Sequence, residues 1–301
     1  MQQSYEVIII GGSYAGLSAA LALGRSLRRT LVIDAGDPCN KSAPASHNFL
    51  THDGAAPAEI GRMAREEVLQ YKTVAFLEDS ASAISGADGD FRVSTHANGS
   101  FQTKKVVFAT GLHDELPDIP GVRECWGKSV IHCPYCHGYE VRHQPTGILM
   151  NSEHTLQMVN LIRNWTEQLT LFTNGPATID RDKVAATGTR LVEQPIDHLL
   201  HDAGQLRGIC LTDGSEVDLR ALYLHPVLTQ KCPLPAAMGC ELADNGTLWV
   251  DEFSMTTVPG IYAAGDCTTH MRAVSYATGG GTLAGAMVNH GLVIDQSAAR
   301  A

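Results

Sequence analysis

Two cysteines and two histidines stand within nine residues, His132 to Glu140, which read HCPYCHGYE. Cys133, Cys136 and His137 match the C-x-x-C-H pattern of covalent haem attachment, and thiolates with imidazoles are also common zinc ligands. A third chemistry for the same residues is a pair of thiols that forms and opens a disulfide. The stretch therefore admits a haem, a zinc or a dithiol site.

The composition of the whole chain narrows the classes of function. Of its 301 residues 44% are hydrophobic, and 22 Lys and Arg against 32 Asp and Glu give a formal net charge of -10. This length predicts two domains. Because no basic run occurs, we expect no nucleic-acid partner. No stretch approaches the ~20 apolar residues of a membrane span, and no leader precedes the first apolar run, so we expect a cytoplasmic protein without membrane contact.

The other cysteines are scattered along the chain: Cys39, Cys125, Cys210, Cys232, Cys240 and Cys267. In a reducing compartment such residues are mostly small buried hydrophobes, so only the pair calls for a chemical explanation. Haem attachment normally takes place outside the cytoplasm, and four ligands within six residues are poorly placed to surround one zinc ion. These points favour a dithiol over a metal site, with a pair of inert buried thiols as the remaining alternative.

The N-terminal sequence predicts a dinucleotide-binding βαβ unit. Val7 to Ile10 is an unbroken apolar, β-branched run, which is typical of a strand buried on both faces. Gly11 ends this strand, a helix is expected over 14–27, and a second buried strand runs from Thr30 to Asp34. In such a unit the helix start faces a pyrophosphate and the terminal carboxylate faces the ribose hydroxyls.

One position departs from the G-x-G-x-x-G fingerprint of these units. Gly11 and Gly16 are present, but Ser13 replaces the middle glycine. Serine is small enough to let the backbone approach a phosphate, although a bare glycine turn in a parallel sheet remains the alternative.

Three further motifs bring a family into view. VVFATG spans Val106 to Gly111, TTVPGIYAAGDC spans Thr256 to Cys267, and CPYCHGYE lies between them. In this order the motifs resemble low-molecular-weight thioredoxin reductases and their dithiol-oxidase relatives, within the pyridine nucleotide-disulfide oxidoreductases (class II). The resemblance implies an α/β fold with two Rossmann-like domains, the second inserted in the first. Residues 1–113 and 222–301 would form an FAD-binding domain, and residues 114–221 a central domain that carries the CxxC pair.

The resemblance also assigns roles in flavin binding. Asp266 would accept a hydrogen bond from the ribityl chain, Arg272 and Ala273 would lie beside the pyrimidine edge of the flavin, and Asn48 would lie in a loop near it. The implied cofactor-binding residues are Gly11, Ser13, Gly16, Asp34, Asn48, Gly111, Asp266, Arg272 and Ala273. A homodimer is implied as well.

For the dithiol, the resemblance places Cys136 against the flavin and lets Cys133 exchange with substrate. Thiol-disulfide exchange needs a base for the attacking thiol and an acid for the leaving one, and His137 can serve as either near neutral pH. Thioredoxin reductases carry an aspartate at this place, so the histidine is more similar to the dithiol-oxidase branch. Glu140 either orients the imidazole or is simply solvated.

The central domain repeats the βαβ pattern without its nucleotide-binding residues. A strand is expected at Ile148–Met150, a helix from about Glu153 to Trp165, and a strand at Leu169–Phe172. The turn before the helix reads NSEH and contains no glycine, and TNG follows the second strand where the family places arginines for a 2′-phosphate. We therefore expect at most weak NADPH binding.

These observations lead to one favoured function and two alternatives. The favoured function is an FAD-dependent thiol/disulfide oxidoreductase that acts as a dithiol oxidase or takes electrons from another donor. Its substrate would be a dithiol or disulfide in a small molecule or a thioredoxin-like protein. The alternatives are an NADPH-dependent thioredoxin reductase-like enzyme and a non-catalytic flavin-binding module. No metal is expected in any of them.

Overall fold

The computed structural model describes residues 4–299, which form two compact units. Unit 1 consists of the described parts of Met1–Lys41, Phe49–His113 and Leu228–Ala301, and unit 2 consists of Ser42–Asn48 and Asp114–Val227. Residues 42–48 and 222–227 thus belong to unit 2, whereas the sequence-based boundaries placed them in the other domain. For residues 42–48 the cause is local packing. Ser42 lies so close to Gly127 of unit 2 that a Cβ at Gly127 would come within 3.1 Å of Ser42 Cβ.

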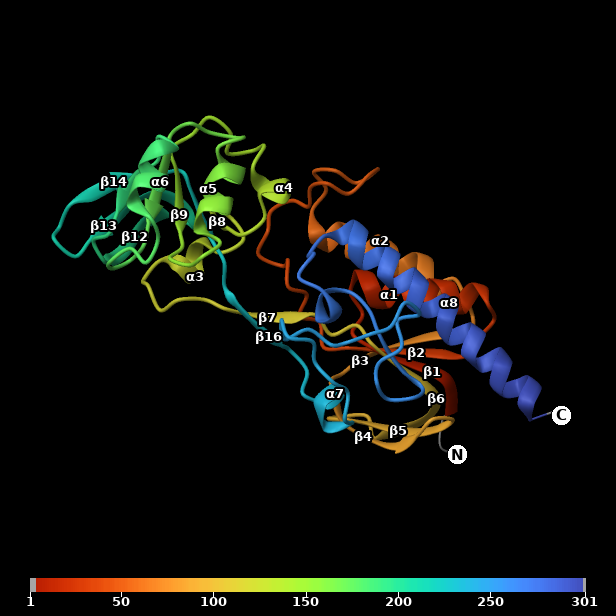
Figure 1. The fold of residues 1–301 in the computed structure, drawn as a ribbon. Helices are drawn as coiled ribbons and strands as arrows, with labels where there is room; N and C mark the ends of the chain where they lie inside the picture. Colours follow the sequence, from red (N-terminus) through yellow and green to blue (C-terminus); the bar gives the residue numbers. More distant parts are fainter. Residues whose placement is uncertain (1–3, 300–301) are drawn as a thin grey trace. The chain divides into compact units, whose positions relative to one another are not determined.

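Unit 1 is built on a seven-stranded sheet with the order β3-β2-β1-β6-β5-β4, and β17 pairs with β6 (Figure 1). The strands are β1 (Ser4–Ile10), β2 (Thr30–Asp34), β3 (Val74–Glu78), β4 (Ala81–Ala87), β5 (Asp90–Thr95), β6 (Ser100–Phe108) and β17 (Ile261–Ala263). Strands β1, β2, β3, β6 and β17 run parallel, and β4 and β5 extend the sheet antiparallel. The first two predicted strands are confirmed.

Apolar cores cover both faces of these parallel strands. Val7 and Ile9 belong to one core, together with residues of α1 and α8, while Ile8 and Ile10 belong to the other. The unbroken apolar run of β1 follows from this double burial. The helices of unit 1 are α1 (Tyr14–Arg25), α2 (Pro57–Leu69), α7 (Leu234–Ala237), α8 (Val274–Ala298) and the 3₁₀ turn η1 (Asp266–Thr268).

The C-terminal part of the chain completes unit 1. Helix α8 lies beside α1 (Figure 1), and at Gly281 a Cβ would come within 2.1 Å of the Ala15 carbonyl oxygen. Lys105 of β6 is 3% exposed and forms ion pairs with Asp88 at 2.7 Å and with Asp295 of α8 at 2.8 Å. The packing of α1 and the ion pairs of Lys105 in β6 therefore both depend on α8, from the far end of the chain.

Unit 2 contains a second parallel sheet, with the order β11-β10-β9-β15-β8. Its elements are α3 (Val122–Cys125), β8 (Val130–Ile131), α4 (Pro134–His137), β9 (Thr146–Leu149), α5 (Thr155–Ile162), β10 (Leu169–Phe172), α6 (Arg181–Ala186), β11 (Arg190–Val192) and β15 (Ala221–Leu224). With a βαβ arrangement in each unit, the predicted fold class is confirmed. Strands β7 (Leu112–Glu115) and β16 (Val227–Gln230) pair where the chain passes between the units.

The second predicted helix is shorter than expected. It was expected from about Glu153 to Trp165, but α5 begins at Thr155 and ends at Ile162. At its start the reason lies in the preceding turn, where the Ser152 amide donates to Thr155 Oγ1 at 2.9 Å and so closes a turn outside the helix. At its end, residues 163–165 form a turn instead of continuing the helix.

A small antiparallel sheet completes unit 2. It consists of β12 (Ile196–Asp202), β13 (Gln205–Leu211) and β14 (Glu216–Asp218). Among residues 4–299, no helix has both the length and the apolar character needed to cross a bilayer.

Candidate functional site

The glycine turn of unit 1 is shaped by close backbone approaches. Gly11 has φ +105°, and a Cβ there would lie 2.2 Å from the Ala109 carbonyl oxygen. A Cβ at Gly16 would lie 1.8 Å from the Gly11 carbonyl oxygen. Both positions therefore require glycine, and the start of α1 lies tightly against the sheet, as a pyrophosphate-binding turn needs.

Ser13 and Asp34 flank this turn. Ser13 is the N-cap residue of α1 but makes no capping hydrogen bond with its side chain, and no acidic residue lies in the first helical turn. Asp34, at the end of β2, accepts a hydrogen bond from the Gly12 amide at 2.8 Å. No acidic residue of α1 itself opposes the positive end of this helix, and the Asp34 carboxylate is fixed beside the turn.

The other motifs of unit 1 meet at the same edge of the sheet. The Ala264 amide donates to the Phe108 carbonyl at 2.9 Å, and this bond joins the motif VVFATG to the motif TTVPGIYAAGDC. Gly265 then lies against α1, where a Cβ would come within 2.7 Å of Ala15 Cβ. Gly111, with φ +68°, lies in the short turn between β6 and β7. Three segments that are distant in sequence therefore surround the start of α1, an arrangement that fits a dinucleotide.

The residues expected near the flavin divide between the units. Asp266 begins η1, and its Oδ2 lies 3.3 Å from Arg272 Nε, with side-chain exposures of 13% and 8%. Ala273 is the N-cap residue of α8. Asn48 has φ +59° and belongs to unit 2, unlike the others. An ion pair whose side chains are this well shielded from solvent suits recognition of polar groups, so the unit 1 residues fit the group that the sequence implies.

The cysteine pair of unit 2 is joined as a Cys133–Cys136 disulfide. Cys133 caps the one-turn helix α4, and its Sγ accepts a hydrogen bond from the Cys136 amide at 3.2 Å. With the two sulfurs joined, neither is a thiolate that can bind zinc. His132 stacks on Trp126, with ring centroids 5.7 Å apart.

Trp165 supports the turn that carries the disulfide. The ring of Tyr135 meets it edge-on at 5.8 Å. A Cβ at Gly138 would come within 2.9 Å of Trp165 Nε1, so the glycine of CHGYE allows the turn to approach the indole. The exposed Tyr135 and Tyr139 lie beside the cysteines in the sequence and present aromatic surface to solvent.

His137 stands in a specific electrostatic environment. Burial lowers its pKa below the usual value, the negative charge of Glu140 opposes this, and His47 adds to the lowering. The imidazole is therefore neutral near pH 7 and can accept a proton from a thiol. His47 Nε2 lies 3.6 Å from Glu140 Oε1. Sequence reasoning missed His47, because no local pattern connects residues 42–48 with the cysteine turn.

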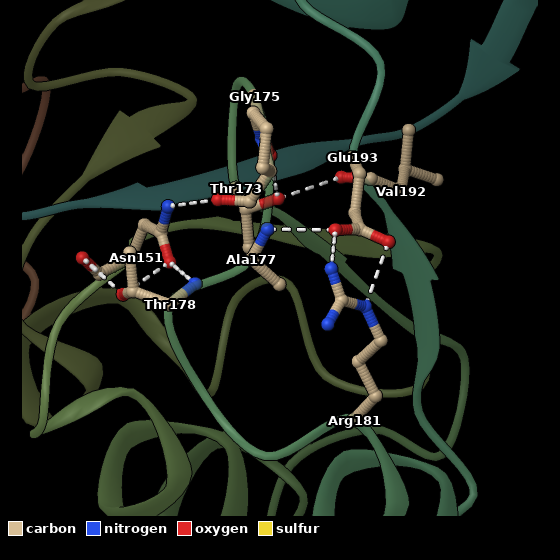
Figure 2. Close-up of polar contacts among 9 residues, drawn as sticks. Asn151, Thr173, Gly175, Ala177, Thr178, Arg181, Val192 and Glu193 are labelled. Atoms are coloured by element: carbon tan, nitrogen blue, oxygen red, sulfur yellow. Dashed lines mark hydrogen bonds and ion pairs between the residues drawn. The ribbon is translucent and has the colours of Figure 1, made fainter.

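At the carboxyl edge of the parallel sheet in unit 2, polar contacts join the turn after β9 to the loop after β10 (Figure 2). Asn151, which follows β9, donates from Nδ2 to the Pro176 carbonyl at 3.0 Å. Its Oδ1 accepts from the amide and the hydroxyl of Thr178, both at 2.8 Å. These bonds hold the turn and the loop together at this edge of the sheet.

A second set of contacts holds the other side of this loop. Glu193 Oε1 accepts from the Ala177 amide and from Arg181 Nη2, each at 2.6 Å, and Oε2 accepts from Arg181 Nε at 3.1 Å (Figure 2). The sequence-based interpretation found no basic group after Phe172, but the structure brings Arg181 to this loop. Because Glu193 binds its guanidinium at two points, the positive charge is already compensated.

Comparison with known proteins places this arrangement in a family. The sequence matches the pyridine nucleotide-disulphide oxidoreductases over residues 5–158 and 200–281. The chain belongs to this family. Residues 159–199, which include the loop after β10, lie outside the match.

Similar proteins support the same assignment. The chain is 31% identical to thioredoxin reductase aclD of Aspergillus oryzae over 315 residues, which covers 98% of each sequence. Among solved structures, an oxidoreductase from Agrobacterium tumefaciens has a TM-score of 0.91 and 36% identity, covering 97% of this chain and 99% of that one. A putative thioredoxin reductase TrxB from Bacillus anthracis has a TM-score of 0.92 and 30% identity, covering 97% and 99%. The predicted enzyme class, a flavin-dependent disulfide oxidoreductase of the thioredoxin reductase type, is confirmed.

Proposed function

We propose that this family member is an FAD-dependent dithiol oxidase that uses the Cys133–Cys136 disulfide and does not depend on NADPH. The observation that carries the proposal is the carboxyl edge of the unit 2 sheet. There, hydrogen bonds to Asn151 and Glu193 hold the loop after β10 at the place where we expect a nucleotide in related enzymes (Figure 2). Charge at this edge points the same way, because the exposed Glu153 stands just before α5 and the cation Arg181 is already paired.

The chemistry can be followed on the residues of unit 2. One thiol of the substrate, deprotonated by His137, attacks Cys133 Sγ, so the Cys133–Cys136 bond breaks and Cys136 leaves as a thiolate. The second substrate thiol then attacks the substrate sulfur of the mixed disulfide and releases Cys133. The substrate loses two electrons and becomes a disulfide, and the enzyme pair gains them as a dithiol. FAD, when bound, supplies the acceptor that reoxidises the pair and can pass the two electrons to dioxygen, which yields hydrogen peroxide.

The second candidate is an NADPH-dependent thioredoxin reductase-like enzyme. The names of two relatives favour it, since aclD is a thioredoxin reductase and TrxB a putative one. A non-catalytic flavin-binding module is supported less, because such a module needs neither the cysteine pair nor a neutral histidine beside it. The homodimer and the cytoplasmic location stay predictions.

An anaerobic reduction experiment separates these functions. The purified protein should carry FAD, identified by chromatography after heat release, and FMN or no flavin would contradict the proposal. NADPH, NADH and a dithiol are then mixed with it separately while the flavin absorbance is followed. We expect bleaching by the dithiol alone, and Cys133→Ser should abolish it. Rapid and complete bleaching by NADPH would instead establish the reductase cycle.

A further inference from the structure

The outer face of the small sheet in unit 2 carries a row of metal-binding residue types. The register pairs His198 of β12 with Cys210 of β13, and Cys210 with Glu216 of β14. Directly opposed residues of neighbouring strands share one face of a sheet. The adjacent residue Ile209 pairs with buried Leu199 and points into the core, so the row lies on the opposite, solvent-facing side.

A register shift adds a fourth group to this row. The pairing of β12 with β13 is irregular between Ile196 and His198, so Asp197 and His198 together oppose Cys210. Such a bulge turns two successive side chains toward the same side. Asp197 Oδ2 lies 2.7 Å from His198 Nδ1, and one ligand atom each from Asp197, His198 and Cys210 lies within 4.8 Å of the others.

The surroundings of Cys210 are negative. The carboxylates of Asp197, Glu216 and Asp213 act electrostatically on its sulfur. Within residues 4–299, no lysine or arginine forms an ion pair with any of these three carboxylates. The cluster therefore combines a sulfur, an imidazole and several carboxylates with no compensating cation from the protein.

We propose that Cys210, His198 and Asp197, with Glu216 beside them on the same face of the sheet, bind a divalent cation of borderline softness, with Zn²⁺ as the natural occupant. Thiolate, imidazole and carboxylate are the ligand types that zinc takes in proteins. The contact between Asp197 Oδ2 and His198 Nδ1 holds these two side chains together on the side of Cys210. Binding replaces the thiol proton of Cys210 with the metal and releases that proton to solvent. The proposal does not depend on the enzymatic function.

Cobalt provides a direct test, because a thiolate bound to Co²⁺ gives a charge-transfer absorption. Untagged protein is kept with its Cys133–Cys136 disulfide intact, so that those sulfurs contribute no thiolate. We expect one Co²⁺ per chain with this absorption, and its displacement by Zn²⁺. Cys210→Ser should remove the absorption, while Cys232→Ser, which changes another half-buried free cysteine, should keep it. Asp197→Asn should weaken binding by about 10- to 100-fold.

Two results would overturn the proposal. One is the absence of stoichiometric Co²⁺ binding to the wild-type protein. The other is an absorption that persists unchanged in Cys210→Ser, which would place the metal on another thiol. If Cys210→Ser does not fold, His198→Gln on the same exposed face gives the same decision, since it must also weaken Co²⁺ binding.

Discussion

Glu193→Gln should make the chain bind NADPH more tightly without changing its affinity for NADH. In the wild-type protein Glu193 contacts Arg181 at 2.6 and 3.1 Å, and this pairing lowers the pKa of Glu193 to about 2, so the carboxylate is ionised at pH 7. Glutamine keeps an acceptor oxygen for the Ala177 amide but loses the charge. The guanidinium then becomes available to a 2′-phosphate, which NADPH has and NADH lacks.

The magnitude follows from one new contact. Because the Arg181 side chain is exposed, its pairing with a 2′-phosphate is screened by solvent, and we expect the Kd for NADPH to fall by a factor of only about 2 to 5. The Asn151 contacts remain in this variant, so we expect tighter binding without rapid reduction of the flavin. The effect should also fall with added salt, because the new contact is exposed.

Isothermal titration calorimetry with NADPH and NADH measures this change. Glu167→Gln removes an exposed carboxylate elsewhere in unit 2 and is the matched control. Equal tightening for both nucleotides would show a general charge effect instead of phosphate recognition. An unchanged affinity for NADPH would refute the view that Glu193 compensates the cation of this edge.

Three further predictions concern the flavin, the cysteines and the histidine. Gly16→Ala should lower stability by about 1–3 kcal/mol and reduce flavin content, because its Cβ would lie 1.8 Å from the Gly11 carbonyl; Gly61→Ala, with no atom within 4 Å, should stabilise by about 0.5–1 kcal/mol in the same thermal melts. Cys133→Ser should produce a long-wavelength absorbance shoulder in the flavin-loaded protein and Cys136→Ser should not; identical spectra would contradict the assigned roles. Glu140→Gln should lower the pKa of His137 further and move the acid limb of kcat/KM to lower pH, whereas His47→Gln should move it to higher pH, and NMR titration of His137 reports the same shifts without turnover.

The sequence was most informative where one local pattern determines the structure. The buried runs of β1 and β2 and the helix between them were predictable, because apolar periodicity and a glycine turn are properties of neighbouring residues. The strand β10 was predicted with its correct bounds, Leu169–Phe172. By contrast, the start of α5 depends on a single hydrogen bond from the Ser152 amide, which no propensity predicts.

Contacts between distant residues were out of reach. His47 and Glu140 approach each other because residues 42–48 pack in unit 2, and no motif records that packing. Arg181, the first residue of α6, lies beside the loop after β10 because its guanidinium pairs with Glu193, which follows β11. The row of His198, Cys210 and Glu216 arises from strand register and a bulge, which are fixed by pairing across the sheet and cannot be read along the chain.

The completion of unit 1 by β17 and α8 has a consequence for synthesis on the ribosome. Unit 2 lies almost entirely in the continuous stretch Asp114–Val227, so it can fold as soon as it emerges. The face of α1 that packs on α8 must wait for residues up to Ala298, which at ~5–20 residues per second is roughly 10 to 40 s after β6 is made. During this interval Ala15, Ala19 and Ala22 lack the helix that later covers them, and Lys105 lacks Asp295. The nascent N-terminal half therefore keeps this apolar face of α1 exposed until the C-terminal helix has been made.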